Sequence, residues 1–119
     1  MALITENLIS WQYEAYPVAH QDRRNLLIHI LTEPLFVSGI LSIPGAFVSG
    51  RPLAALGGVG AVLIAAIAQG RGHKIEKNPP AKFASPLDVV ARLFLEQFVT
   101  FPRFVLSGGF SRAWRAAGS

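Results

Sequence analysis

Two long apolar segments, separated by a single arginine, constrain the fold of this chain more than any other feature. Residues 25–50 (NLLIHILTEPLFVSGILSIPGAFVSG) and residues 52–70 (PLAALGGVGAVLIAAIAQG) lie on either side of Arg51. An α-helix needs about 20 apolar residues to cross a bilayer, and the second segment carries no charged residue at all. The short turn predicts two antiparallel helices. Gly57, Ala61 and Ala65 are spaced four apart, and small residues at this spacing predict a face on which the helices pack closely.

The composition favours a membrane protein made only of helices. The chain has 119 residues, which predicts a single domain over 1–119. Hydrophobic residues make up 51% and charged residues 15%, whereas soluble domains carry about 25% charged residues. There is no cysteine, so disulfides and thiolate metal ligands are excluded. We therefore predict an all-α, small helical integral membrane protein.

A third hydrophobic helix is expected at residues 85–109, where Ser85 and Pro86 suit a helix start. A polar stripe runs along one face of this helix and consists of Asp88, Arg92, Glu96, Thr100 and Arg103. Because charges at membrane depth are costly, we expect this stripe to face the protein interior; an internal ion-pair ladder and a helix lying on the membrane surface are the alternatives. In the first apolar helix, Pro34 and Pro44 predict a kink or a break.

The two ends of the chain and its charges indicate an orientation. Trp and Tyr residues in 1–24 suggest an interfacial segment, and 110–119 forms a short basic tail. The net charge is +4 without a continuous basic tract, so nucleic-acid binding is not expected. Basic residues gather at the open end of the expected hairpin: Arg23, Arg24, Arg71, Lys74, Lys77 and Lys82. Only Arg51 marks the other end, which predicts that the open end faces the cytoplasm.

The three histidines of the chain collect at this same end of the expected hairpin. Asn25, His29 and Glu33 share one helix face, and His73 and Glu76 are three apart. Histidine nitrogens with a carboxylate suit Fe(II), Mn(II) or Zn(II). The alternatives are polar anchors at the membrane interface, ion pairs at helix ends, such as Glu33 with Arg24 or Arg92, and axial ligands of a haem.

Two histidine blocks resemble a known family. The first is Y-x-x-x-H-x-x-x-x-N-x-x-x-H, formed by Tyr16, His20, Asn25 and His29, and the second is QGRGHKIEKNPP at 69–80. Together they resemble the Mpo-like family of 2-hydroxy fatty acid dioxygenases, from about Trp11 to the end of the third hydrophobic segment. The chain departs from the family pattern at Thr32 and Glu33, where many members have Gly and an aliphatic residue before the proline.

The resemblance implies an Fe(II)-dependent enzyme that shortens 2-hydroxy fatty acids by one carbon with O2. It implies an internal membrane and iron held by His20, His29 and His73. A bacterial inner membrane is the other location that we expect, and the charge asymmetry predicts a site near the cytoplasmic face. Asn25 and Glu76 are the expected catalytic residues, and Glu33 or Glu96 could be a further ligand or orient a ligand histidine. Arg71, Lys74 or Arg92 would bind the substrate carboxylate.

The expected partners are a fatty-acid or lipid substrate, O2, the bilayer and a possible second copy of the chain. Two other functions stay open at this point. One is a non-catalytic membrane module whose histidines stabilise helix packing. The other is a haem- or zinc-binding membrane protein.

Overall fold

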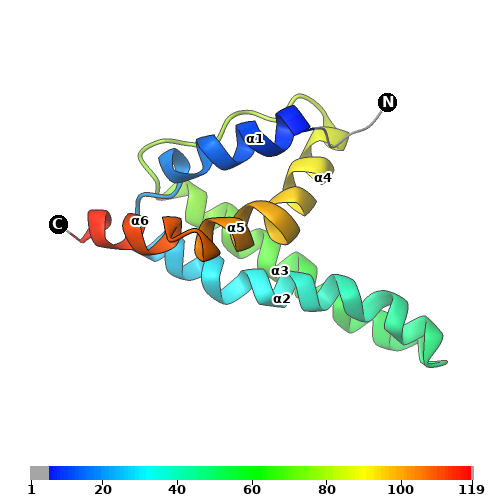
Figure 1. The fold of residues 1–119 in the computed structure, drawn as a ribbon. Helices are drawn as coiled ribbons and strands as arrows, with labels where there is room; N and C mark the ends of the chain where they lie inside the picture. Colours follow the sequence, from blue (N-terminus) through cyan, green and yellow to red (C-terminus); the bar gives the residue numbers. More distant parts are fainter. Residues whose placement is uncertain (1–5, 119) are drawn as a thin grey trace.

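Residues 6–118 are described by a computed structural model, and each regular element in this range is helical (Figure 1). In chain order the elements are α1 (Glu6–Ala15), η1 (Tyr16–Ala19), α2 (Arg23–Val48), η2 (Pro52–Ala54), α3 (Ala55–Lys74), α4 (Pro86–Leu95), η3 (Glu96–Thr100), α5 (Phe101–Leu106) and α6 (Gly109–Ala117). The all-α prediction is confirmed for the described residues.

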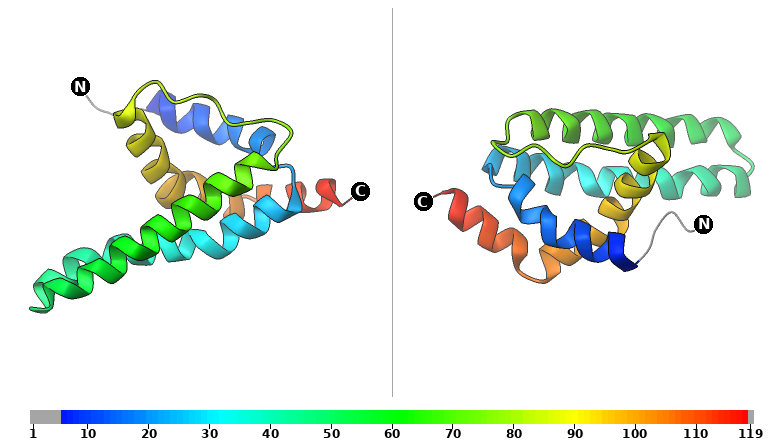
Figure 2. Two further views of the ribbon diagram at one scale, coloured as in Figure 1. Left: turned by 180° about the vertical axis from the view of Figure 1, so that it is seen from behind. Right: turned by 90° about the horizontal axis from the view of Figure 1, so that it is seen from above.

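The α2–α3 hairpin is the longest part of the molecule, and its closed end extends well beyond the other helices (Figures 1 and 2). Arg23–Val48 and Pro52–Lys74 are both long and apolar enough to cross a membrane by length and composition. Only 22% of each apolar window is buried inside the protein. These helices therefore expose their apolar side chains over most of their length, unlike the core helices of a soluble domain.

Close contact between two glycines sets how α2 and α3 cross. A Cβ placed on Gly39 would lie 2.7 Å from the Gly58 carbonyl oxygen, and one on Gly58 would lie 2.6 Å from the Gly39 carbonyl oxygen. Neither position has room for a side chain. Ala65 is fully buried in the same interface, as the sequence predicts, but Gly57 is exposed and a Cβ there would meet no atom within 4 Å. The small-residue face thus runs through Gly58 and not Gly57.

Of the kink or break expected at Pro34 and Pro44, the break is wrong, because α2 continues as one α-helix through both residues. A proline inside a helix removes one backbone hydrogen bond. Both prolines are exposed, and α3 packs along α2.

The third hydrophobic segment is divided into α4, η3 and α5, and it does not form a long span within the described residues. η3 is a π-helical turn in which the Phe101 N–H donates to the Glu96 carbonyl. A π turn inserts one extra residue into a helix, so neighbouring residues Glu96 and Gln97 both turn toward the interior. Arg92 and Thr100 are buried as the polar stripe predicts, but Arg103 is exposed and its guanidinium lies 3.8 Å from the centre of the Tyr13 ring.

The remaining helices cover the open end of the hairpin (Figure 2). The core there consists of Tyr16, Leu26, Phe101 and Phe104, with Phe110 and Trp114 of α6 packed against it. Arg23 Nε donates to the Trp114 carbonyl at 2.9 Å. The expected basic tail is therefore mostly the docked helix α6. Residues 1–5 of the expected interfacial segment lie outside the described residues.

Candidate metal centre

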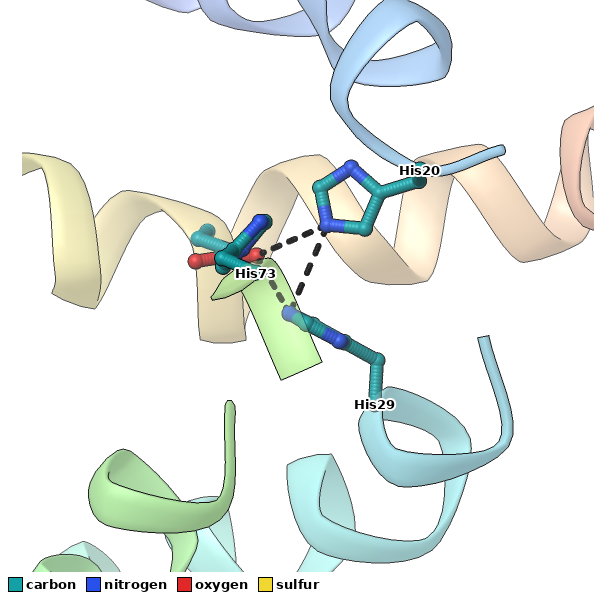
Figure 3. A group of neighbouring side chains, drawn as sticks. His20, His29 and His73 are labelled. Carbon is teal, nitrogen blue, oxygen red and sulfur yellow. Dashed lines mark hydrogen bonds and ion pairs between the residues drawn. The ribbon is translucent and has the colours of Figure 1, made fainter. Parts of the chain in front are cut away.

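Four side chains from four separate parts of the chain meet at the base of the hairpin: His20, His29, His73 and Glu96. His20 follows η1, His29 lies on α2, His73 lies in the last turn of α3, and Glu96 begins η3. One nitrogen or carboxylate oxygen of each lies within 4.8 Å of the others. His29 Nε2 is 3.4 Å from both His20 Nε2 and Glu96 Oε2, and His20 Nε2 is 3.8 Å from that oxygen (Figure 3).

The hydrogen bonds of two histidines fix their tautomers. His20 Nδ1 lies 2.7 Å from the Tyr16 carbonyl, and His29 Nδ1 lies 3.0 Å from the Asn25 carbonyl. A carbonyl oxygen only accepts, so both Nδ1 atoms carry a proton, and in the neutral imidazoles both Nε2 atoms present lone pairs. Two nitrogen lone pairs and a carboxylate oxygen repel one another at these distances unless a proton or a metal cation lies between them. Metal-binding histidines characteristically donate their other N–H to a carbonyl or carboxylate in this way.

The surrounding groups favour the protonation states that a metal ligand needs. Burial above all lowers the pKa of His20 to about 3, so this imidazole is neutral at pH 7. Burial raises the pKa of the Tyr16 hydroxyl, and the Glu96 carboxylate raises it further. Tyr16 therefore keeps its proton and donates it to Glu96 Oε2 at 2.7 Å.

The four residues fit a metal ion. Ligands bound about 2.0–2.2 Å from one ion lie roughly 3–4 Å from their neighbours, as the atoms of His20, His29 and Glu96 do, and the ligand nitrogen of His73 lies within 4.8 Å of them. His73 Nδ1 is buried without a hydrogen-bond partner, and a buried polar atom without a partner is costly. A cation held by this group would offset the repulsion among the lone pairs.

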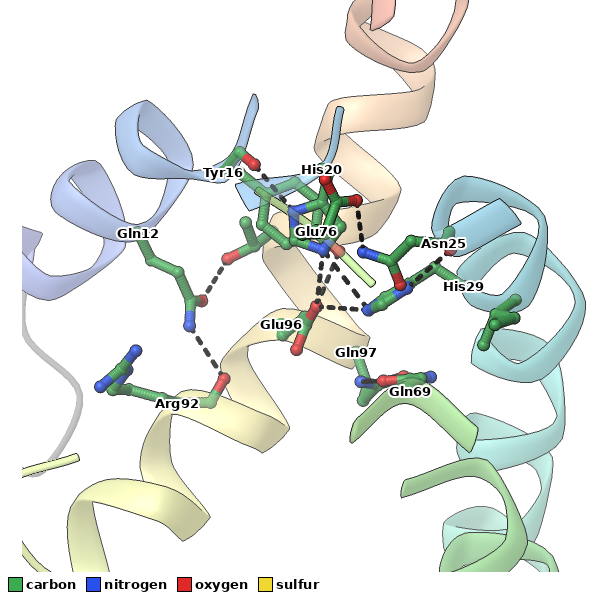
Figure 4. Close-up of polar contacts among 12 residues, drawn as sticks. Gln12, Tyr16, His20, Asn25, His29, Gln69, Glu76, Arg92, Glu96 and Gln97 are labelled. Carbon is green, nitrogen blue, oxygen red and sulfur yellow. Dashed lines mark hydrogen bonds and ion pairs between the residues drawn. The ribbon is translucent and has the colours of Figure 1, made fainter. Parts of the chain in front are cut away.

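Glu76 and Asn25 lie beside this group and have other contacts. The Glu76 carboxylate accepts from the backbone N–H of Gln21 at 2.9 Å, from that of Asp22 at 3.1 Å and from Asn25 Nδ2 at 2.8 Å (Figure 4). A carboxylate is favourable at a helix N-terminus. Glu76 thus joins the end of α3 to the start of α2. The bond to Asn25 lies four residues before His29 on α2.

The other expected site residues are dispersed. Glu33 is not part of the histidine group, and Arg24 and Arg92 form their ion pairs with Asp22 and Asp88. Arg71 and Lys74 are exposed.

Of Arg71, Lys74 and Arg92, the three residues expected to bind the substrate carboxylate, Arg92 is the buried one. Its Nη atoms donate to the carbonyls of Ala81 at 2.9 Å and Lys82 at 3.2 Å, in the linker 75–85 between α3 and α4. The guanidinium lies 4.1 Å from the centre of the Phe83 ring, and its Nε is buried without a partner.

A cavity of about 690 Å³ opens beside the histidine group. His20, His73 and Glu96 reach its wall, together with Gln12, Gln69 and Arg92. The rest of the wall is mostly apolar and comes from α1, η1, α3, the linker and α4; it includes Trp11, Ala66, Phe83, Val89 and Leu93. A few polar groups at one place in an apolar cavity are typical of a site for a small, largely apolar ligand.

Two contacts that support the histidine group were not predicted from the sequence. The Tyr16 ring stacks on His20 at 3.8 Å in addition to its bond to Glu96, and the Y-x-x-x-H spacing was the signal for it. Gln69 and Gln97 exchange two buried amide hydrogen bonds of 2.7 and 3.2 Å. This pair joins α3 to η3: Gln69 lies one turn before His73, and Gln97 directly follows Glu96. No spacing in the sequence indicates that the two glutamines meet.

Gly72 supplies the first test of this arrangement. A Cβ at this position would overlap Asn25 Oδ1 and lie 3.1 Å from Asn25 Cγ. We expect Gly72→Ala to lower the free energy of unfolding by about 1–3 kcal/mol, as overpacking does, and to weaken metal binding, because Asn25 and His73 are both displaced. Thermal unfolding and metal content measure the two effects. Gly70→Ala on the same helix is the control, since a Cβ there meets nothing within 4 Å; equal losses in both variants would contradict the expectation.

The fold and the site define a small helical protein with a buried group of three histidines and one glutamate beside an apolar cavity. A family model described as 2-hydroxy-palmitic acid dioxygenase Mpo1-like matches residues 7–103, which contain all four residues of the group. The chain belongs to this Mpo1-like family. No curated protein and no solved structure matches it significantly.

Proposed function

We propose that this protein is a membrane-bound, Fe(II)-dependent dioxygenase that shortens 2-hydroxy fatty acids by one carbon with O2. Membership of a family described by a 2-hydroxy-palmitic acid dioxygenase supports the reaction class. The observation that carries the proposal is the convergence of two imidazole lone pairs and a carboxylate oxygen beside an apolar cavity.

His20, His29, His73 and Glu96 would hold the iron. Nitrogen and oxygen ligands of this kind suit Fe(II), Mn(II) and Zn(II), and of these iron supplies the redox chemistry that a reaction with O2 requires. Tyr16 orients the Glu96 carboxylate through its hydroxyl and the His20 ring through stacking. Glu76 and Asn25 act as positioning residues, because they fix the start of α2 and thereby the direction of His29.

The cavity would hold the substrate. Its apolar wall suits an alkyl chain, and its polar end coincides with the histidine group. We assign the substrate carboxylate to Arg92, whose buried Nε has no partner and which lines the cavity. Charge-assisted hydrogen bonds of this type contribute about 1.5–3 kcal/mol.

Arg92→Met tests this assignment against Arg71→Met. For 2-hydroxypalmitic acid, we expect the first change to raise KM about 10-fold or more with a smaller effect on kcat, since the lost bond contributes to binding. The exposed Arg71 lies outside the cavity wall, and its variant should behave as the wild type. Competition by the substrate methyl ester separates binding from folding. The acid should lose its advantage over the ester only in Arg92→Met, and a retained preference would remove Arg92 from this role.

The α2–α3 hairpin would insert into the bilayer. Between Glu33 and Arg71 its only charged residue is Arg51 at the closed end, and its apolar side chains are largely exposed. The basic residues at the open end support a histidine group near the cytoplasmic face, because such residues favour that side by the positive-inside rule.

Metal analysis combined with turnover tests the function as a whole. We expect the purified protein to contain about one iron per chain and to convert 2-hydroxypalmitic acid with consumption of O2. Iron-free protein should regain activity with Fe(II) but not with Zn(II). A protein that holds zinc or haem, or that converts the acid equally well without iron, would refute the proposal.

A further inference from the structure

Gly70 stands on the cavity wall one helical turn from the histidine group. Ala66, Gln69, Gly70 and His73 of α3 all line the cavity. Gly70 precedes His73 by three residues, which is about 4.5 Å along the helix axis. Gly70 therefore lies beside the part of the cavity that a ligand bound at the histidine group would enter first.

Neither backbone conformation nor packing requires a glycine at this position. A Cβ at Gly70 would meet no atom within 4 Å, in contrast to Gly58 and Gly72 of the same helix. The positive φ angles among the described residues belong to Gly50 and Gly108. A glycine inside a helix costs roughly 1 kcal/mol relative to alanine, so Gly70 lowers helix stability without improving the packing of the protein.

We propose that Gly70 is a specificity-determining residue that keeps the cavity open for an unbranched acyl chain beside the histidine group. This inference rests on the proposed function in one respect, namely that the cavity holds the acyl chain of the substrate. A side chain at position 70 would project into the space between α3 and the facing wall, where Val89 and Leu93 of α4 and Trp11 of α1 lie. The Cβ itself would meet no atom of the four residues that would hold the metal, since nothing lies within 4 Å of it.

Gly70→Leu and Gly60→Leu form a matched pair for the test. Both glycines lie on α3, and at both a Cβ would meet nothing within 4 Å. Leucine raises helix propensity equally at the two positions. Gly60 lies outside the cavity wall, so only Gly70→Leu fills the cavity.

Trp11 provides a direct measure of binding. The chain has two tryptophans, and in a Trp114→Phe background the fluorescence comes from Trp11, which lines the cavity. Bromine-labelled palmitic acid should quench Trp11 in a saturable way in this background and in its Gly60→Leu variant. In the Gly70→Leu variant we expect the apparent Kd to rise about 10-fold or more, with iron content unchanged.

The outcomes separate this inference from the proposed function. Equal quenching in the Gly70→Leu and Gly60→Leu variants, with iron and turnover intact, overturns the role of Gly70 and leaves the dioxygenase proposal standing. Loss of quenching in Gly70→Leu alone supports that role, even in a protein found to lack iron or turnover, in which case the dioxygenase proposal fails by itself.

Discussion

Replacing His29 by alanine should leave the purified protein with less than about a tenth of the wild-type iron and without measurable conversion of 2-hydroxypalmitic acid. His29 Nε2 lies 3.4 Å from both His20 Nε2 and Glu96 Oε2, and the residue is almost completely buried. Loss of a residue that merely supports a ligand lowers metal affinity about 10–100-fold. Loss of a ligand itself should exceed that range.

Iron content and O2 consumption measure this effect, and Ile30→Ala supplies the control. Ile30 is the next residue on α2 and packs partly buried against the core of Tyr16, Leu26, Phe101 and Phe104. Its truncation should lower the unfolding temperature while iron and turnover remain. If His29→Ala keeps full iron and turnover, His29 is not a ligand and the metal centre must be placed elsewhere.

The parts of the site that the sequence predicted depend on local order along the chain. His20, His29 and His73 come together because two adjacent apolar segments must form a hairpin, and the spacing of the residues then places them at its open end. The all-helical fold follows from the same segments. These inferences need only segment length, helical period and a short turn.

The remaining features depend on contacts that spacing does not record. The polar stripe already predicted an inward Glu96 as a candidate ligand, but not the π turn that brings Gln97 inward beside it, because nothing in the local pattern distinguishes a π turn from a regular helix. The Glu76 carboxylate turns to the backbone at the start of α2 because three donors meet there, although its spacing from His73 suggested a shared face. Gly58 replaces Gly57 in the hairpin contact because the crossing of two helices fixes their relative rotation.

Glu96→Gln should remove most of the bound iron while the protein stays folded. Glutamine has nearly the same shape as glutamate but no charge, and its amide group can donate to the imidazole nitrogens that now face the carboxylate. An NH2 group in the place of Oε2 could donate to the lone pairs of His20 and His29 without a cation, although Tyr16, which donates to this same oxygen, would then lose its acceptor there. We expect iron affinity to fall about 100-fold or more and turnover to fall with it, whereas the unfolding temperature of the metal-free protein stays the same or rises.

Glu33→Gln is the matched control, because it makes the same chemical change on α2 at a carboxylate outside the histidine group. Glu33 belongs to the Thr32–Glu33 pair that departs from the family pattern, so the comparison also shows whether that departure alters the metal centre. Iron retained in Glu33→Gln and lost in Glu96→Gln makes Glu96 the carboxylate ligand and leaves the centre independent of the departure. The reverse result would move the ligand to Glu33, and the added carboxylate would then be a metal-binding feature particular to chains that carry it.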